Sequence, residues 1–235
     1  MPGDFCVRDR LFLLAHDEDR GFRPRIHLRT LGVGLSGAVL IDLVAAGRIH
    51  VAGNKAAITD LYDHRQVGDP IDDHALATVR ASYLPPPASH TLPPAVRPGS
   101  PSLRDLITRM AAGIYERTLG GLVAAGLVTH TRIRLGRSRY QPADQTVLVH
   151  AGGAIRDVVA GRSGADEATD GLCALIRLLR LHDALYLGDP SQVDPGLAQA
   201  SVRLQTHATQ PCTDILAIVA AIDAAIGDIT VAVYR

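Results

Sequence analysis

Hydrophobic positions along this chain recur mainly at the spacing of an α-helix. Residues 4–16 and 193–206 place their apolar side chains on one side, with charged residues between them. Three longer segments are apolar on most of their faces: 30–46, 172–187 and 212–226. Helices that are apolar all round cannot each face water. We therefore expect these three segments to bury one another at the centre of a helical bundle.

Further helices are predicted around this centre, at 71–83, 103–125, 143–160 and from 166 onward. The acidic pair Asp72–Asp73 is placed to cap the first of them, and Ser102 is placed to cap the second. Gly113 is expected to bend the 103–125 helix, because glycine weakens a helix interior. The pattern as a whole predicts an all-α fold.

One β-hairpin interrupts the helical pattern, at residues 129–140. Apolar and arginine side chains alternate along its first strand, and Gly136 stands at the reversal. A shorter strand-like piece at 48–51 precedes a turn at Gly53–Asn54. Residues 84–101 are rich in proline, which forbids helix and favours extended backbone. That segment fits either a domain linker or a long surface loop.

Composition narrows the partners and the compartment. Lys and Arg total 24, as do Asp and Glu, so the formal net charge is zero. The overall charge of the protein therefore favours neither nucleic acid nor a membrane, and a charged partner would have to bind a local patch of opposite charge. The three cysteines are isolated, which argues against a disulfide framework and a zinc site. No uninterrupted apolar run reaches the ~18 residues of a membrane span. We expect a cytoplasmic protein, and the preference for arginine over lysine indicates a GC-rich bacterial source.

Motifs of catalysis are missing from the sequence. It contains no HExxH, GxSxG, P-loop or GxGxxG motif in the structural context that such a motif requires. The adjacent pairs His16–Asp17, Asp63–His64 and His182–Asp183 do not form dyads by themselves, because neighbouring residues on a helix point in different directions. We predict no enzymatic activity, no cofactor and no metal site.

A winged-helix nucleic-acid module is one alternative. Residues 114–126 followed by the basic segment 129–140 resemble a recognition helix and a wing. A recognition helix should carry exposed Arg, Lys, Asn or Gln toward the base edges, and TLGGLVAAG carries none of these. Nucleic acid is therefore the weaker prediction.

The segment LFLLAHDEDRGF…GLSGAVLIDLVAAGRIHV resembles the opening signature of the Golgi phosphoprotein 3 family, and YERTLGGLVAAGLV resembles its segment before a β-hairpin. The resemblance covers nearly the whole chain and implies one domain, 1–235, in which 84–101 is a surface loop. It also implies a central four-helix bundle with one protruding hairpin. Eukaryotic members recognise phosphatidylinositol 4-phosphate on Golgi membranes and act as adaptors for resident enzymes, so a binding function is implied here.

The family's phosphoinositide pocket uses a Trp, the Arg of a Gly-Leu-Arg-Gly motif and two further Arg. This chain has His27 nearest the Trp, Ser36 in place of the first Arg, and Ala112 and Tyr115 in place of the other two. Substitute cations stand in the loop before the second helix, which carries Arg23, Arg25, His27 and Arg29, and in the hairpin. The candidate lipid-phosphate residues are Arg25, His27, Ser36, Tyr115, Arg117, Arg132, Arg134, Arg137 and Arg139.

Period-two spacing puts Arg132 with Arg134, and Arg137 with Arg139, on one face of their strands. If the turn pairs the strands suitably, four guanidinium groups share one face; otherwise these charges only keep an exposed ribbon soluble. We expect a non-catalytic peripheral or adaptor protein at the inner face of the membrane. Loop 23–29, Arg117 and the hairpin would form one positive face around a pocket between the second helix and the 103–126 helix. An anionic phospholipid headgroup is the expected partner, with protein clients and self-association through the hairpin as alternatives.

Overall fold

A computed structural model of the protein describes residues 5–60, 63, 65–81, 101–132, 138–162, 166–185 and 190–233. Most of the proline-rich segment, residues 84–100, lies outside this part of the chain, so the choice between loop and linker stays open. The same holds for Arg134, Gly136 and Arg137 at the predicted turn of the hairpin.

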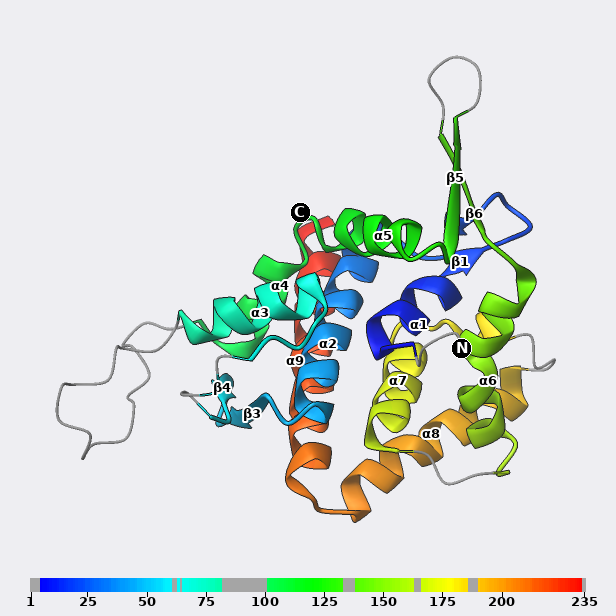
Figure 1. The fold of residues 1–235 in the computed structure, drawn as a ribbon. Coiled ribbons are helices and arrows are strands. Elements are labelled where there is room, and N and C mark those ends of the chain that lie inside the picture. Colours follow the sequence, from blue (N-terminus) through cyan, green and yellow to red (C-terminus); the bar gives the residue numbers. More distant parts are fainter. Residues whose placement is uncertain are drawn as a thin grey trace, which may run out of the picture.

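Helices dominate the structure (Figure 1). Their bounds are α1 Val7–Leu14, α2 Leu28–Ala45, α3 Pro70–Arg80, α4 Leu103–Met110, α5 Ile114–Ala124, α6 Gln145–Val159, α7 Glu167–Leu178, the 3-10 helix η2 His182–Leu185, α8 Pro190–Thr206 and α9 Gln210–Val233. Three antiparallel pairs complete the described part: β1 His16–Asp17 with β2 Arg23–Pro24, β3 Ile49–Ala52 with β4 Lys55–Ile58, and β5 Val128–Arg132 with β6 Ser138–Pro142. The all-α fold with one projecting hairpin is confirmed, although β1, β2 and β4 were not predicted.

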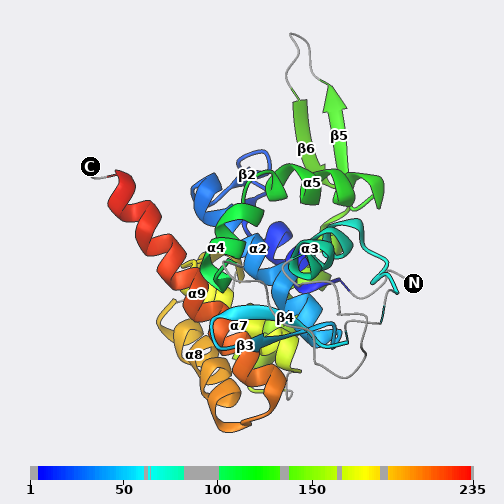
Figure 2. The ribbon, with the colours of Figure 1, turned by 90° about the vertical axis from the view of Figure 1, so that its left-hand side faces the viewer.

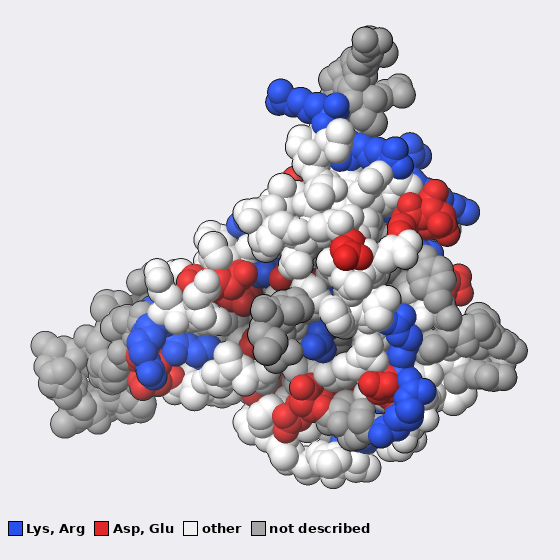
Figure 3. Space-filling view, turned by 45° about the vertical axis from the view of Figure 1, so that its right-hand side comes forward, with Lys and Arg blue, Asp and Glu red and all other residues white. Residues whose placement is uncertain are grey.

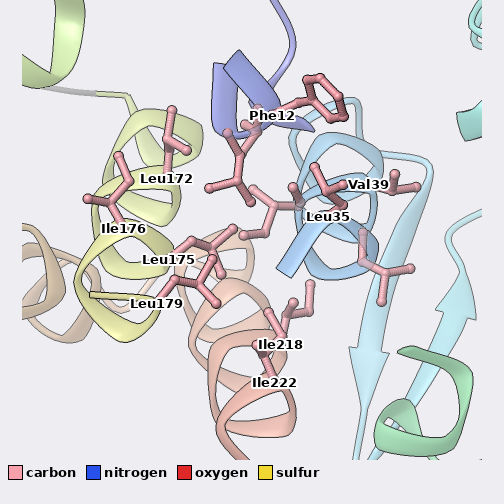
Figure 4. Close-up of a cluster of buried hydrophobic side chains, with 14 of the residues drawn as sticks. Phe12, Leu35, Val39, Leu172, Leu175, Ile176, Leu179, Ile218 and Ile222 are labelled. Atoms are coloured by element: carbon pink, nitrogen blue, oxygen red, sulfur yellow. The ribbon is translucent and has the colours of Figure 1, made fainter. Parts of the chain in front are cut away.

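The three apolar segments do form the centre of the molecule, as α2, α7 and α9. Figure 4 shows Leu35 of α2, Leu175 of α7 and Ile218 of α9 pointing into one cluster, and all three are wholly buried. Close approach of α2 and α9 depends on Gly37, because a Cβ there would lie only 2.0 Å from Cδ1 of Ile222. The helix α1 packs against α2 and α7 and completes the bundle.

The central position of α2 explains its composition. By length and hydropathy it could cross a membrane, since its mean hydropathy is 1.6 over 18 residues. In the structure, 72% of this window is buried inside the bundle. Asp42, which interrupts the apolar run, accepts hydrogen bonds from the backbone N–H groups of Val7 (2.8 Å) and Arg8 (3.1 Å) at the start of α1.

Several helix ends differ from the prediction because local contacts set them. The cap of α3 is Asp69, which accepts from the N–H groups of Ile71 and Asp72, and not the pair Asp72–Asp73. The predicted 103–125 helix is broken into α4 and α5, with Gly113 in the left-handed region at φ 76°. The helix expected to reach residue 187 stops at Leu178, where Arg180 takes φ 56° and the N–H of Leu181 bonds to the carbonyl of Ile176.

The β5–β6 ribbon projects from one end of the molecule, beside α5 and the β1–β2 hairpin (Figure 1). The turned view shows the same ribbon standing above α5, while the C-terminal part of α9 extends away from the body (Figure 2). The segment 16–30, α5 and the β5–β6 ribbon are called the hairpin end below.

Candidate functional site

The register of the β5–β6 ribbon decides which of its side chains share a face. Arg132 lies opposite Ser138, and Arg139 lies opposite Thr131. Since neighbouring residues of a strand point to opposite faces, Arg132 and Arg139 are on different faces of the ribbon. The expectation of guanidinium groups gathered on one shared face is therefore wrong for this pair. The spacing of arginines within each strand could not reveal the offset between the strands.

Each face of the ribbon has a distinct character. On one face the rings of His130 and Tyr140 stack at a centroid distance of 4.8 Å, and the exposed Arg132 follows His130 on the same side. On the other face the Nε and Nη2 atoms of Arg139 donate to the side-chain oxygen of Gln141 at 2.6 and 2.9 Å, when the amide is oriented to accept them. Among the residues that the structure describes, no carboxylate pairs with either arginine.

The loop between α1 and α2 is nearly balanced in charge. Arg25 lies 3.5 Å from the carboxylate of Asp17, and its Nε donates to the carbonyl of His16 at 3.2 Å. Arg20 also approaches Asp17, at 3.6 Å. Figure 3 shows acidic and basic side chains together just below the projecting ribbon, whereas the ribbon itself carries basic ones. Arg25 therefore serves mainly to hold the loop together.

The start of α2 presents a second exposed part of the hairpin end. His27 is the N-cap, and its Nδ1 accepts a hydrogen bond from the N–H of Arg29 at 3.2 Å. The side chains of His27 and Arg29 are exposed, and Leu28 between them is 51% exposed. Leu28 was not predicted as a site residue. The signal for it is an apolar residue between two polar ones, outside the buried stripe that begins at Leu31.

Ser36 lies inside the molecule and does not reach the hairpin-end surface. It is wholly buried, and its hydroxyl donates to the carbonyl of Gly32 at 2.9 Å within α2. Gly32 packs against the break between α4 and α5, where a Cβ would lie 3.0 Å from the carbonyl oxygen of Ala111. Close packing leaves no free space between α2 and the α4–α5 break at this point, and the pocket expected between the second helix and the 103–126 helix stays a prediction.

Tyr115 joins α5 to the end of α1 through His16. The Nδ1 of His16 lies 2.6 Å from the carbonyl of Phe12, which can only accept, so Nδ1 carries the proton. The Nε2 of His16 then accepts from the hydroxyl of Tyr115 at 3.0 Å. Burial lowers the pKa of His16 to about 4, and burial raises the pKa of Tyr115 to about 12. Both side chains are neutral at pH 7, and the pair fixes the position of α5.

Arg117 is exposed on α5 near the break before that helix. Its Nε and Nη2 donate to the carbonyls of Gly113 and Ala112, each at 3.2 Å. These two acceptors are neutral, so the positive charge of Arg117 is not compensated by them. The hairpin end thus presents exposed cations at Arg29, Arg117, Arg132 and Arg139.

A buried ionic cluster at the other end of α1 was missed by sequence reasoning. Arg8 is only 3% exposed, and its guanidinium bonds to Asp69 at 2.8 and 2.9 Å, to Asp72 at 3.2 Å and to Asp9 at 2.9 Å. Burial raises the pKa of Asp72 to about 7 and that of Asp42 to about 6. The cluster connects α1 with α2 and α3 and has a structural role.

The described residues gather no group of three or more His, Cys, Asp or Glu side chains that could hold a metal ion. Cys173 and Cys212 are buried, while Cys6 is partly exposed, and all three thiols are free.

A family model described as Golgi phosphoprotein 3 (GPP34) matches residues 7–217. No curated protein matches the chain.

Proposed function

The chain belongs to the Golgi phosphoprotein 3 family, and on that premise we propose that it is a non-catalytic peripheral protein whose hairpin end binds anionic, phosphate-bearing lipid headgroups. The observation that carries the proposal is the projecting ribbon, on which Arg132 and Arg139 are exposed and have no carboxylate partner among the described residues. An uncompensated guanidinium group is well suited to a phosphate, because its planar fork can donate to two oxygens at once.

Arg132 and Arg139 lie on opposite faces of the ribbon, and this determines the orientation in which both could contact a membrane. A ribbon lying flat could use only one of the two arginines, whereas a ribbon entering the headgroup layer end-on could use both. Each basic residue near an anionic surface contributes about 1 kcal/mol. Together with Arg29 and Arg117, the ribbon would contribute about 4 kcal/mol, which corresponds to roughly 10³-fold enrichment at the surface.

Leu28 would add an apolar contribution to the same contact. Its exposed position between His27 and Arg29 places an aliphatic side chain among groups that favour anionic headgroups. Complete burial of a leucine side chain contributes about 1.5–3 kcal/mol, so partial insertion of Leu28 is comparable with one or two arginine contacts.

Phosphatidylinositol 4-phosphate is the headgroup that the family suggests. Two positions that correspond to the family's arginines, Ser36 and Tyr115, make internal hydrogen bonds in this chain. Recognition of a phosphoinositide would therefore fall to the exposed arginines, and we expect selectivity by charge more than by headgroup shape. We propose that the protein is cytoplasmic and associates with the inner face of the membrane. There it would recruit protein clients.

The winged-helix alternative gains no support from α5. Arg117 is the single Arg, Lys, Asn or Gln of α5, and its Nε and Nη2 already donate to backbone carbonyls. The other exposed positions, which include Glu116, Gly120, Gly121 and Ala124, carry no donor for base edges. Duplex DNA in the buffer of the lipid experiment provides the direct comparison.

Co-sedimentation with vesicles tests the proposal. Neutral phosphatidylcholine vesicles are compared with vesicles containing phosphatidylserine or phosphatidylinositol 4-phosphate at matched surface charge and low salt. We expect binding to both anionic vesicles and little to neutral ones. The double variant Arg132→Gln/Arg139→Gln should weaken binding by roughly 30-fold, since two contacts of about 1 kcal/mol each are lost.

The matched control is Arg65→Gln/Arg162→Gln, which removes the same charge from exposed positions already paired with Asp63 and Asp157. This control should bind almost as the unmodified chain does. Equal losses in both double variants would show that only net charge matters and would reject the hairpin end as the site. Absence of binding to any anionic vesicle at low salt would reject the lipid function, leaving an adaptor that binds protein partners only.

A further inference from the structure

A cavity of about 460 Å³ is lined by residues of α7, η2, α8 and α9. Its polar lining comes from Arg177, Arg180, His182, Asp194 and Ser201, and Leu178 and Val219 form part of an apolar wall. None of these residues belongs to the β5–β6 ribbon, α5 or segment 16–30.

The cations of this cavity outnumber its carboxylates. Asp194 accepts from the Nε of Arg177 at 3.0 Å and from the Nε2 of His182 at 3.2 Å, and both contacts use the same oxygen, Oδ1. Hydrogen bonds from Arg177 keep the pKa of Asp194 below its usual range, so this carboxylate is ionised. One negative charge therefore faces two guanidinium groups. The backbone N–H of Arg180 donates to the carbonyl of Arg177 at 3.1 Å. In the described part of the chain, no group accepts a hydrogen bond from the guanidinium of Arg180 or from the Nη atoms of Arg177.

The backbone at Arg180 gives a second, independent observation. Its φ is 56°, in the left-handed region, just after α7 ends. Glycine is the usual residue there, because a Cβ is strained in this conformation. Among the residues that the structure describes, two other non-glycine residues share this conformation. Phe22 buries its ring against His16, and Ala208 has only a methyl group in an exposed turn. Arg180 is neither buried nor short, and its side chain lines the cavity.

We propose that this cavity binds a small oxyanion, a phosphate or the phosphate of a monoester, through Arg180 and the Nη groups of Arg177. Two guanidinium forks can each donate to two phosphate oxygens. The Ser201 hydroxyl stands in the same lining as a further donor, and Leu178 and Val219 suit an apolar carrier of the phosphate. This site is separate from the proposed membrane contact and does not depend on it.

A second explanation for these cations is the negative end of the α7 dipole, which favours positive side chains in the last turn of a helix. That explanation requires Arg177 and Arg180 to stabilise the fold and requires no ligand. The two explanations differ in what glycine at position 180 does. Under both explanations glycine relieves the backbone strain. Under the proposal it also removes a phosphate donor, whereas under the dipole explanation it removes a stabilising charge and leaves no phosphate effect to lose.

Thermal unfolding in inorganic phosphate, against chloride at the same ionic strength, tests the proposal. The unmodified chain should gain in Tm with rising phosphate, because a ligand that binds only the folded state stabilises it. Arg180→Gly should unfold at an equal or higher Tm in chloride, by up to about 2–4 °C from relief of strain. Its phosphate-dependent shift should be lost. The control Ala208→Gly relieves the same kind of strain and should keep the full phosphate shift.

Arg180→Gln serves as a second variant, which keeps the strained backbone and a long side chain but removes the charge. It too should lose the phosphate shift. The proposal is overturned if the unmodified chain shows no phosphate shift beyond that in chloride, or if Arg180→Gly and Arg180→Gln retain it. A lower Tm for Arg180→Gly in chloride with an intact phosphate shift would support the dipole explanation.

Vesicles distinguish the source of the phosphate. If the occupant is a soluble phosphate compound, Arg180→Gly should sediment with phosphatidylinositol 4-phosphate vesicles as the unmodified chain does. If the occupant is a lipid headgroup, the variant should lose vesicle binding together with the phosphate shift. Failure of the hairpin-end variants in the lipid experiment leaves this result unaffected, so the two proposals fail separately.

Discussion

Replacement of Arg8 by methionine tests whether the buried cluster holds α1 in place. The guanidinium of Arg8 is shared by Asp9, Asp69 and Asp72 and is almost completely buried. Methionine fills much of the same volume but leaves the carboxylates without a cation. Removing one partner of a buried ion pair costs about 3–5 kcal/mol. For a chain of this size each kcal/mol lowers Tm by about 2–4 °C, so we expect a loss of roughly 6–20 °C near pH 8.

The loss should depend on pH, and its sign follows from the shifted groups. The pKa of Asp72 is about 7 and that of Asp42 about 6 in the folded chain, above the usual value for aspartate. The folded state therefore binds more protons than the unfolded state between about pH 4 and 7, so acidification through this range favours folding. Without Arg8 the pKa of Asp72 rises further, since Arg8 acts to lower it. The deficit of the variant should thus shrink as the pH falls from about 8 to about 5.5.

Urea unfolding followed by circular dichroism at these two pH values measures both effects. The control is Arg162→Met, which breaks the pair with Asp157 at a distance of 2.7 Å, where the side chains are 64% and 48% exposed. An exposed pair of this kind contributes only about 0–1 kcal/mol. The reasoning is refuted if Arg8→Met costs no more than Arg162→Met, or if its deficit is the same at both pH values.

Three further substitutions test other parts of the account. Tyr115→Phe leaves the Nε2 of buried His16 without a donor and should cost about 1–3 kcal/mol in urea unfolding; no change would mean that this hydrogen bond does not hold α5. Gly37→Ala forces a Cβ against Ile222 and should cost about 1–3 kcal/mol, or more if α2 and α9 cannot separate, whereas a neutral result would contradict their close contact. Leu28→Ser should leave stability within about 0.5 kcal/mol and weaken binding to anionic vesicles by roughly tenfold; unchanged binding would exclude Leu28 from the contact.

The central packing of the fold could be predicted from the sequence because it depends on segments that are apolar on most sides. Such segments have few ways to avoid water, and α2, α7 and α9 bury each other as expected. The helix ends depend on single residues in special conformations or caps. Asp69, Gly113 and Arg180 set three of these ends. Arginine rarely adopts the left-handed conformation that ends a helix, so the sequence around Arg180 did not predict that α7 ends there.

The candidate site was less predictable, because it depends on relations between distant segments. The hairpin itself was confirmed, but the facing of Arg132 and Arg139 follows from the strand register, which the alternation within a strand does not specify. Ser36 and Tyr115 were chosen by alignment to a family pattern, and their internal hydrogen bonds appear only when α1, α2 and α5 are assembled. The Arg8 cluster joins residues that are far apart in the sequence, since Arg8 and Asp69 are more than sixty positions apart. The sequence indicates this cluster only through a charged residue beside an apolar stripe.

The central claim is that the hairpin end, and no other face, meets an anionic membrane. An environment-sensitive fluorophore on Ser138→Cys reports from the ribbon, and one on Thr213→Cys reports from the start of α9 at the opposite end of the molecule (Figure 1). Both would be prepared with Cys6→Ser, since Cys173 and Cys212 are buried. Addition of phosphatidylinositol 4-phosphate vesicles should shift the emission of the Ser138 label to shorter wavelength and leave the Thr213 label unchanged. Equal shifts at both positions, or a shift at Thr213 alone, would contradict the claim.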